Sequence, residues 1–421
     1  MNRTSTSLLD LPNEILLIIL NNLNNMDVLY SLIGIGIERV DLLAQDKIFT
    51  NTLNFVSTDT DGICSINDSI LDRFYIHILP KIHYNVKCLV ESMTMERILL
   101  SGDYPNLNHL KIFKFNQDIV SHYFTVHNSN SLPNLKCFSL TIGVLTYEYD
   151  TQVIPLLRRM CNIEELTLYL CIEGRARFVD GTQLHNEILI YMARLHTFNF
   201  YIRTTAQIDH SVPYLSNEDI QKTFTNVGYE QADCILRYSN TAPLTVCHIF
   251  SLPFAFDRLE MVSNKFPNVI FNNVTFLWVQ DSVPFNHEFF VRIAQSFPLL
   301  KSLRIVNFEP QTSKSAQLKS ENNQSYSVVE YPYITTLEIM YVHTDYIEQL
   351  LDASKTRLPR LTVLKIKYYK LKTATENFTR DAMRLNCMNV QKLSIKEEEE
   401  EEEEEGSIIY PKDFYVYFPL L

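Results

Sequence analysis

Side chains able to bind metals or act as nucleophiles are present, but they do not form recognised motifs. The eight cysteines include no C-x-x-C pair, and none lies at a zinc-binding spacing from a histidine. The segment from Ser57 to Asp68 matches part of a calcium-binding loop, with acids and a glycine at several template positions. It begins with serine, however, and lacks the glutamate that closes such a loop on the ion. We therefore expect a polar connecting turn there.

Enzyme signatures are also missing from the sequence. His185-x-Glu187 and His287-Glu288 have no second set of ligands nearby, and no G-x-S-x-G or H-E-x-x-H motif occurs. The chain has only 9 glycines in 421 residues and neither of the glycine-rich patterns that cradle phosphates. We therefore predict that the protein is not an enzyme, with no catalytic residues, no metal and no cofactor.

The net charge of −12 is concentrated in one segment. Nine consecutive glutamates, Glu397 to Glu405, supply most of it, and the rest of the chain carries −3. A chain with this net charge lacks the basic surface that nucleic-acid binding requires. The apolar run from Ile15 to Leu20 is six residues long, far shorter than a membrane span. With several cysteines in apolar segments, we expect a cytoplasmic or nuclear protein with no nucleic-acid or membrane partner.

The first 35 residues predict two short packed helices. Between Leu11 and Leu23, apolar residues follow the i, i+1, i+4, i+5, i+8 spacing of one helical stripe. Pro12 suits a first helical turn, and Asp10 is a candidate N-cap. A polar break at residues 24–27 precedes a second apolar segment, Val28 to Ile35. The periodicity by itself also fits a helical hairpin with no special role.

These residues resemble the F-box family. Leu11-Pro12-x-Glu14-Ile15-Leu16, followed by Ile19, Leu23, Asp27, Val28 and Leu32, matches the Leu-Pro-x-Glu, Ile, Leu and Asp-Leu positions of that family. F-box domains are short helical modules that bind the Skp-type adaptor of cullin-based ubiquitin ligases. The resemblance implies that such an adaptor contacts Leu11, Pro12, Ile15, Leu16, Ile19 and Leu23. It ends at Gly34 to Arg39, where family members often have Val, Cys, Arg, Arg and Trp.

A short phrase, apolar-x-x-apolar-x-apolar, recurs nine times after about residue 100. Its middle residues are Leu110, Phe138, Leu166, Phe198, Leu277, Leu303, Leu337, Leu364 and Leu393. With a weaker copy centred on Ile249, neighbouring phrases lie 26 to 34 residues apart, except for one interval of 51. Each phrase predicts a strand that buries alternate residues.

Amphipathic stretches between the phrases predict helices. These cover Ile119 to Phe124, Val153 to Met160, Leu184 to Leu195, Leu259 to Phe266, Phe289 to Phe297, Ile347 to Leu351 and Phe378 to Leu385. A strand-turn-helix unit cannot close a core until its neighbours stack on it, so we expect a curved α/β solenoid. The array resembles the leucine-rich repeat family, which F-box proteins commonly carry. A stacked α/β domain without a recognition role is the alternative.

The predicted organisation has five segments. They are an F-box-like helical module (1–55), a helical linker or first cap (56–100), a leucine-rich-repeat-like solenoid (101–396), an acidic disordered run (397–406) and a C-terminal cap (407–421). Residues that flank the buried strand positions are expected to line the concave face of the solenoid. The candidates for substrate binding are Tyr169, Tyr201, Trp278, Arg304, Glu338, Lys365 and Lys367. Trp278, the only tryptophan, is expected beside Arg304 of the next repeat, or else beneath a loop.

The sequence therefore predicts a substrate-recognition adaptor of a Skp-cullin-F-box ubiquitin ligase, acting in the ubiquitin-like-protein (Ubl) conjugation pathway. Its partners would be a Skp-type adaptor with its cullin ligase and an unidentified protein substrate. A repeat scaffold without ligase association is the main alternative. A hydrolase built on irregular repeats is a third possibility.

Overall fold

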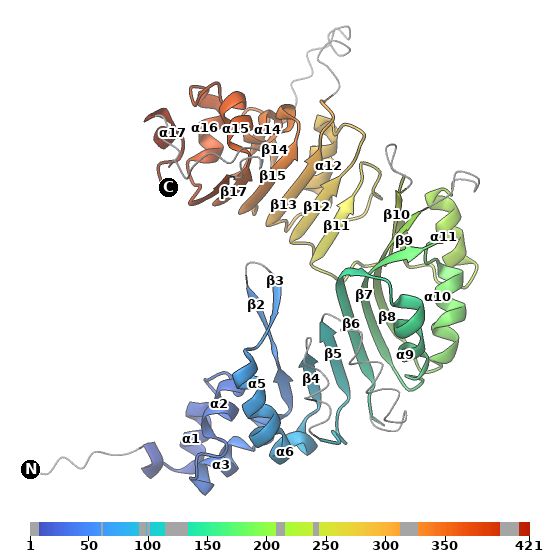
Figure 1. The fold of residues 1–421 in the computed structure, drawn as a ribbon, viewed down its shortest axis with the longest axis vertical. Helices are drawn as coiled ribbons and strands as arrows, with labels where there is room; N and C mark the ends of the chain where they lie inside the picture. Colours follow the sequence, from blue (N-terminus) through green and yellow to red (C-terminus); the bar gives the residue numbers. More distant parts are fainter. Residues whose placement is uncertain are drawn as a thin grey trace, which may run out of the picture. The chain divides into compact units, whose positions relative to one another are not determined.

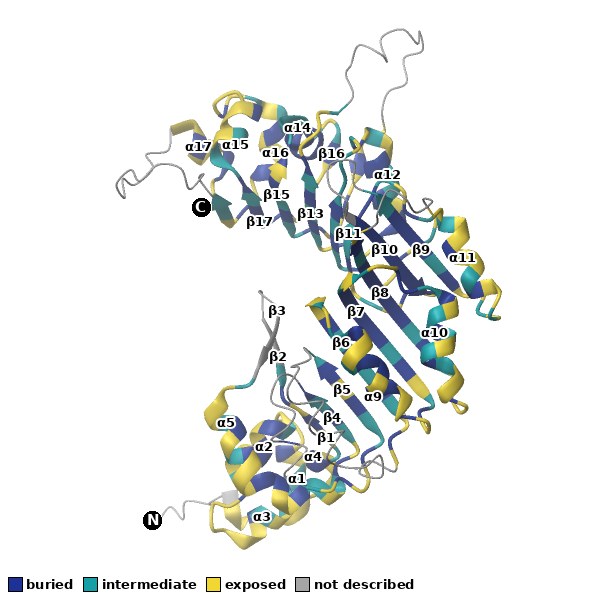
Figure 2. Cartoon of the chain, turned by 45° about the vertical axis from the view of Figure 1, so that its right-hand side comes forward, coloured by how far each residue is buried: buried dark blue, intermediate teal, exposed yellow. Residues whose placement is uncertain are grey.

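The chain of this computed structural model forms two compact units (Figure 1). The first unit comprises Met1–Ala206 and Lys222–Glu230, and the second comprises Gln207–Gln221 and Gln231–Leu421. The structure describes residues 8–59, 62–91, 98, 102–113, 134–207, 215–238, 244–311, 327–395 and 412–421. Buried residues concentrate on the strands, whereas much of the outer surface of the helices is exposed (Figure 2).

Four short helices open the first unit, after a 3-10 turn at Leu8–Asp10. They are α1 (Asn13–Leu20), α2 (Asn25–Leu32), α3 (Glu38–Ala44) and α4 (Lys47–Thr50). The predicted pair of N-terminal helices is therefore confirmed. Asp10 is not the N-cap, because Pro12 precedes α1 and no side chain caps it. The Asn24 side chain caps α2 by accepting a hydrogen bond of 2.8 Å from the Met26 amide.

The helical region continues beyond the first four helices, through α5 (Asp68–Arg73) and α6 (Leu79–Ile82). Arg73 donates hydrogen bonds to the carbonyls of Tyr30 and Ile33 at 2.9 and 3.0 Å. These carbonyls lie at the C-terminal end of α2, where helical carbonyls lack partners within the helix. Arg73 therefore joins α5 to α2.

A β-hairpin precedes α5. Strand β2 (Val56–Asp59) pairs antiparallel with β3 (Gly62–Ser65). The segment expected to be a polar turn, Ser57 to Asp68, is thus largely strand, and residues 60–61 lie outside the described residues. The difference arises because the sequence of this short polar stretch lacks the regular alternation of apolar and polar residues from which strands are predicted.

The first sheet has eight strands in the order β1-β4-β5-β6-β7-β8-β10-β9. Their bounds are β1 (Thr52–Asn54), β4 (Cys88–Glu91), β5 (His109–Phe113), β6 (Cys137–Thr146), β7 (Glu165–Arg175), β8 (Thr197–Gln207), β9 (Ala232–Tyr238) and β10 (Leu244–Ser251). Strands β1, β4, β5, β6, β7 and β8 pair in parallel, so Leu110, Phe138, Leu166 and Phe198 form one buried row in register. Strands β9 and β10 are antiparallel to each other, which makes the sheet mixed.

Helices α9 (Ile154–Arg158) and α10 (Gly181–Glu187) lie beside β6 to β8 in the first unit (Figure 1). Gly181, the first residue of α10, approaches the backbone of Phe224 closely. A Cβ atom at position 181 would lie 2.7 Å from the Cα of Phe224. Only glycine fits there without moving the backbone.

The second sheet is entirely parallel, with the order β11-β12-β13-β15-β17-β18. Its strands are β11 (Arg258–Val262), β12 (Phe276–Gln280), β13 (Ser302–Asn307), β15 (Thr336–Val342), β17 (Val363–Ile366) and β18 (Lys392–Ile395). Leu259, Leu277, Leu303, Leu337 and Leu364 form its central buried row. A parallel pair of two-residue strands, β14 (Val329–Glu330) and β16 (Thr356–Arg357), accompanies it.

Helices line the second sheet on one side (Figure 1). They are α12 (His287–Ser296), α14 (Thr344–Leu351), α15 (Tyr368–Ala374) and α16 (Asp381–Cys387). Asn286 caps α12 by accepting a hydrogen bond of 2.9 Å from the Phe289 amide. The rings of Phe285 and Phe289 then stack with their centroids 4.1 Å apart, which fixes the first turn of α12 against the core.

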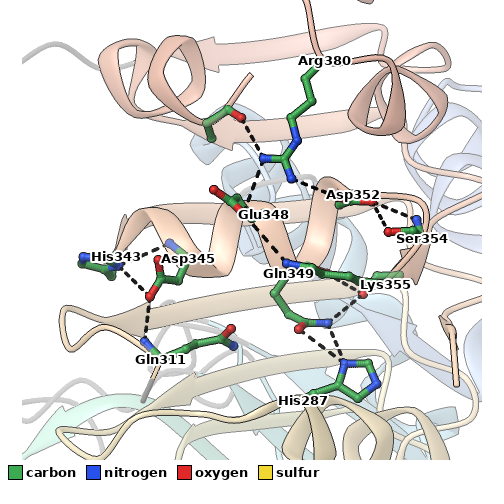
Figure 3. Close-up of polar contacts among 12 residues, drawn as sticks. His287, Gln311, His343, Asp345, Glu348, Gln349, Asp352, Ser354, Lys355 and Arg380 are labelled. Carbon is green, nitrogen blue, oxygen red and sulfur yellow. Dashed lines mark hydrogen bonds and ion pairs between the residues drawn. The ribbon is translucent and has the colours of Figure 1, made fainter. Parts of the chain in front are cut away.

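Polar contacts fix α14 among its neighbours (Figure 3). Arg380 lies 3.4 Å from the Glu348 carboxylate and 3.2 Å from that of Asp352, both on or beside α14. The Gln349 amide lies 3.1 Å from Nδ1 of His287 on α12. These contacts join three segments that are distant in the sequence, so they hold the helical layer in register behind the sheet.

The C-terminal segment, expected as a cap at 407–421, contains the helix α17 (Lys412–Tyr417). The rings of Phe414 and Tyr417 lie 5.2 and 5.6 Å from that of Phe378, and the Tyr417 hydroxyl donates a hydrogen bond to the Arg380 carbonyl. The glutamate run, Glu397 to Glu405, lies outside the described residues.

One predicted helix is wrong. Residues Leu259 to Phe266 contain the strand β11, not a helix. A bulge explains the error, because Leu259 pairs with Leu277 whereas Val262 pairs with Val279. Two buried residues three positions apart therefore lie on one face of a strand, and this spacing imitates a helical repeat. The other predicted helix that lacks an observed counterpart, Ile119 to Phe124, lies outside the described residues.

The single curved solenoid predicted over 101–396 is also wrong. The strands belong to two separate sheets, and the eight-stranded one is mixed. All nine phrases form strands, as do Val246 and Ile249 of the weaker copy. The 51-residue interval contains most of the antiparallel pair β9-β10, which a uniform repeat of parallel strands cannot include. The fold is α/β with two large sheets and two small two-stranded ones. No described helix is long and apolar enough to cross a membrane.

Candidate protein-interaction surfaces

A first candidate surface lies on α1. Three of its apolar side chains, Ile15, Ile18 and Ile19, are exposed by 43, 62 and 38 %, and Leu23, in the turn after the helix, is exposed by 56 %. We refer to these four residues as the α1 surface. The helix buries Leu16 and Leu20 on its other side. A helix that faces only solvent does not usually expose four neighbouring apolar side chains. Such an exposed apolar patch is typical of a partner-binding site.

The residues predicted to bind the ligase adaptor therefore divide into two groups. Ile15, Ile19, Leu23 and Pro12 are exposed, and Leu11 is partly exposed. Leu16 is only 3 % exposed, so its side chain belongs to the core and positions the helix. The prediction omitted Ile18, which lies three residues after Ile15 and therefore on a neighbouring part of the same helical surface.

Arg39 of α3 holds the segment that precedes α1. Its guanidinium donates hydrogen bonds to the carbonyls of Leu9 and Leu11 at 2.7 and 2.5 Å, and to the Asn13 side chain at 2.7 Å. The planar guanidinium has several N–H donors, so it can bind three acceptor oxygens at once. Sequence reasoning missed this role, because Arg39 falls where the family pattern ends.

A second candidate surface crosses the second sheet. Trp278, Arg304, Glu338 and Lys365 occupy neighbouring strands in direct register. The Arg304 guanidinium lies 4.4 Å from the centroid of the Trp278 ring and 3.0 Å, at Nε, from Glu338. The Lys365 ammonium lies 3.4 Å from the other oxygen of Glu338. The predicted neighbours Trp278 and Arg304 are thus confirmed, and all four residues form one row.

Further charged and aromatic residues lie beside this row on the second sheet. Arg258 lies 4.3 Å above the Phe276 ring and 3.2 Å from Glu260. The Lys367 ammonium is 5.8 Å from the centroids of both Tyr341 and Tyr369. We refer to this set as the sheet-two face: Arg258, Glu260, Phe276, Trp278, Arg304, Glu338, Tyr341, Lys365, Lys367 and Lys392. Arg258 was missed because β11 had been predicted to be a helix.

Trp278 is neither fully exposed nor buried beneath a loop. Its ring is partly accessible and lies under the Arg304 guanidinium. The indole Nε1 is inaccessible to solvent and makes no hydrogen bond. The Arg304 Nε–H likewise does not point at Glu338, despite the short separation, so that contact is an ion pair. The cation above the ring therefore anchors Trp278 in the row.

Tyr169 and Tyr201, the remaining predicted substrate-binding residues, lie in the first sheet. Their side chains are 5 and 0 % exposed, and their rings are 4.7 Å apart. They are neighbours in register on β7 and β8. Their contacts stabilise the first sheet, and they are not part of the sheet-two face.

Several described cysteine and histidine side chains take part in packing. Burial raises the pKa of Cys387 to about 12, and burial together with nearby Asp233 raises that of Cys234 to about 12, so both stay protonated at neutral pH. His287 contacts Gln349 and the Ser327 carbonyl, at 3.1 Å in the latter case. Within the described ranges, no group of three or more His, Cys, Asp or Glu side chains could hold a metal ion.

The two surfaces offer apolar, aromatic and charged side chains that suit binding. The α1 surface is apolar, and the sheet-two face combines cations with aromatic rings. Both combinations are common in protein interfaces. Comparison with known protein-family models and with curated proteins finds no match for this chain.

Proposed function

We propose that the protein is a non-catalytic substrate-recognition adaptor of a cullin-type ubiquitin ligase. The α1 surface binds the Skp-type adaptor, and the sheet-two face binds a protein substrate. The main support is the exposure of Ile15, Ile18, Ile19 and Leu23 in the segment that resembles an F-box. The same helix keeps a buried side of its own, so exposure of these residues does not result from an unfolded segment.

The size of the apolar contact supports a specific complex. Covering an isoleucine or leucine that is about half exposed contributes roughly 1 kcal/mol. The four residues of the α1 surface together contribute about 4 kcal/mol before the cost of association. About 4 kcal/mol is a substantial share of the binding free energy of a complex in which polar contacts also surround the apolar centre.

The first test is co-purification of the full chain with a Skp-type adaptor. Ile15→Asp should abolish binding while leaving circular dichroism unchanged, because Ile15 is 43 % exposed and an acid is tolerated in a first helical turn. Ile270→Asp is the matched control, since Ile270 is 60 % exposed in the second unit. Failure of the unmutated chain to bind, or equal binding by Ile15→Asp, would reject the ligase role.

A second candidate function is a protein-interaction scaffold without ligase association. It is favoured by the segment between α2 and α3, where Gly34 and Gly36 have φ values of 78° and 85° and Arg39 bonds internally. This segment departs from the F-box pattern. A chain that captures partners through the sheet-two face but no Skp-type adaptor would support the scaffold.

A further inference from the structure

We infer that the sheet-two face binds an extended acidic segment of the substrate protein, with a carboxylate at every third residue. This inference rests on the proposed role of that face in substrate binding and specifies the class of substrate. It follows from the charge of the face, from the spacing of its cations and from the aromatic rings between them.

The sheet-two face is more basic than the rest of the protein. Its described residues include five cations, Arg258, Arg304, Lys365, Lys367 and Lys392, and two acids, Glu260 and Glu338. The chain outside the glutamate run carries a net charge of −3. Positive charge is therefore gathered locally, and a partner of opposite charge is favoured.

The cations recur on alternate strands. Arg258 lies on β11, Arg304 on β13 and Lys365 on β17, with β12 and β15 between them in the sheet order. Neighbouring strands are about 4.8 Å apart, so Arg304 and Lys365, which are both in register with Glu338, lie about 9.6 Å apart across the sheet. Arg258 is in register with Ser302, two residues before Arg304, and so lies beside this pair on the same face. A polyproline II segment advances about 9.3 Å in three residues and returns to the same side. Acids at every third position would therefore meet Arg304 and Lys365 in turn.

Aromatic side chains lie beside these cations. The rings of Phe276 and Trp278 lie on β12, between Arg258 and Arg304, and each has a guanidinium above it. Tyr341 lies on β15 near Lys367. Aromatic surfaces receive the prolines of polyproline II segments. The face thus offers cations for the acids and rings for the residues between them.

The two acids of the sheet-two face favour a partner whose negative charges are widely spaced. Glu338 lies between Arg304 and Lys365 and contacts both. A single nucleic-acid strand carries a phosphate about every 3.4 Å along a B-form helix, so some phosphates would face Glu338. Carboxylates about 9 Å apart can lie on either side of Glu338. The arrangement favours a protein segment over nucleic acid.

The test uses the full chain and a fluorescein-labelled (Glu-Pro-Pro)4 peptide, with binding followed by fluorescence anisotropy at low salt. Two probes serve as comparisons: a peptide of the same composition with its glutamates in one block, and a 12-residue oligodeoxythymidylate. We expect the (Glu-Pro-Pro)4 peptide to bind most tightly, and its affinity to fall with added sodium chloride.

Charge-removing variants locate the binding site. Lys365→Gln and Lys392→Gln should each weaken peptide binding about threefold, and the double variant about tenfold. Lys372→Gln is the matched control, because Lys372 is an exposed residue of α15 and not of the sheet-two face. Equal binding of the block peptide or the oligonucleotide, or an equal loss with Lys372→Gln, would overturn the inference.

Binding of the Skp-type adaptor, measured on the same variants, separates this inference from the proposed function. Loss of peptide binding with adaptor binding retained supports the inference, because the lysine variants then leave the fold and the α1 surface intact. If the unmutated chain binds the adaptor but no peptide, the inference alone fails. If it binds the peptide but no adaptor, the inference holds and the ligase role fails.

Discussion

Replacement of Asn386 by alanine should strongly destabilise the second unit. Asn386 lies on α16 and is 5 % exposed. Its amide nitrogen donates to the carbonyls of Thr356 and Leu351 at 2.7 and 3.0 Å, and its oxygen accepts from the Leu358 amide at 2.9 Å. One side chain thus satisfies three backbone groups in the interior, between α14, β16 and the chain after it.

The magnitude follows from the groups that lose a partner. A buried polar group left without a hydrogen bond costs about 1–3 kcal/mol, and alanine leaves no atom that could replace the amide. Taking about 1 kcal/mol for each of the three backbone groups gives a loss of about 3 kcal/mol. In a unit of this size, about 3 kcal/mol corresponds to a decrease of about 6–12 °C in the melting temperature.

The assay is urea denaturation followed by tryptophan fluorescence. Trp278 is the only tryptophan and lies in the second sheet, so its emission reports on the second unit. Asn389→Ala is the control, since Asn389 is exposed and makes a single bond of 3.1 Å to the Pro359 carbonyl. We expect that control to lose less than about 1 kcal/mol.

The reasoning would be refuted by a loss below about 1 kcal/mol for Asn386→Ala, or by equal losses for the two variants. Asn386→Asp adds a second check. It keeps the oxygen that accepts from Leu358 but presents a carboxylate to two carbonyls. At neutral pH it should therefore be less stable than the alanine variant, and protonation at low pH should reduce the difference.

Three further predictions concern charged residues. Arg39→Met removes three hydrogen bonds before and at the start of α1, so hydrogen exchange over residues 9–14 should accelerate and adaptor binding should weaken; unchanged exchange would contradict the assigned role. Burial raises the pKa of Asp352, but hydrogen bonds from Ser354 and the charge of Arg380 outweigh burial and hold that pKa below its usual value. The stability from Asp352 is therefore present above its unfolded pKa of about 3.9 and is lost as pH falls through the lower folded pKa. The difference in unfolding free energy between wild type and Asp352→Asn should shrink below about pH 4, and a constant difference would refute this. Glu338→Gln removes the acid from the centre of the sheet-two face, so the (Glu-Pro-Pro)4 peptide should bind about threefold more tightly by anisotropy; weaker binding would contradict the assigned geometry.

Local sequence patterns determined where most strands and helices lie. The nine apolar phrases are all strands, because alternation of apolar residues is set by the two-residue period of a strand. The spacing between phrases also placed Trp278 beside Arg304, because parallel neighbours in register bring equivalent positions together. The helix α1 was likewise predicted from a local period, in this case the 3.6 residues of a helical turn.

The tertiary structure decided how these elements join and which side chains remain accessible. Periodicity does not distinguish Leu16 from Ile15, since both belong to the predicted stripe, and packing alone buries one and exposes the other. The bulge in β11 and the pairing of β9 with β10 arise from contacts between strands, so no repeat length revealed them. The amino-acid sequence by itself thus specified most of the elements and the paired cation and ring on the second sheet. Long-range packing separated the strands into two sheets and placed Arg39 against α1, because those contacts join residues that no local pattern relates.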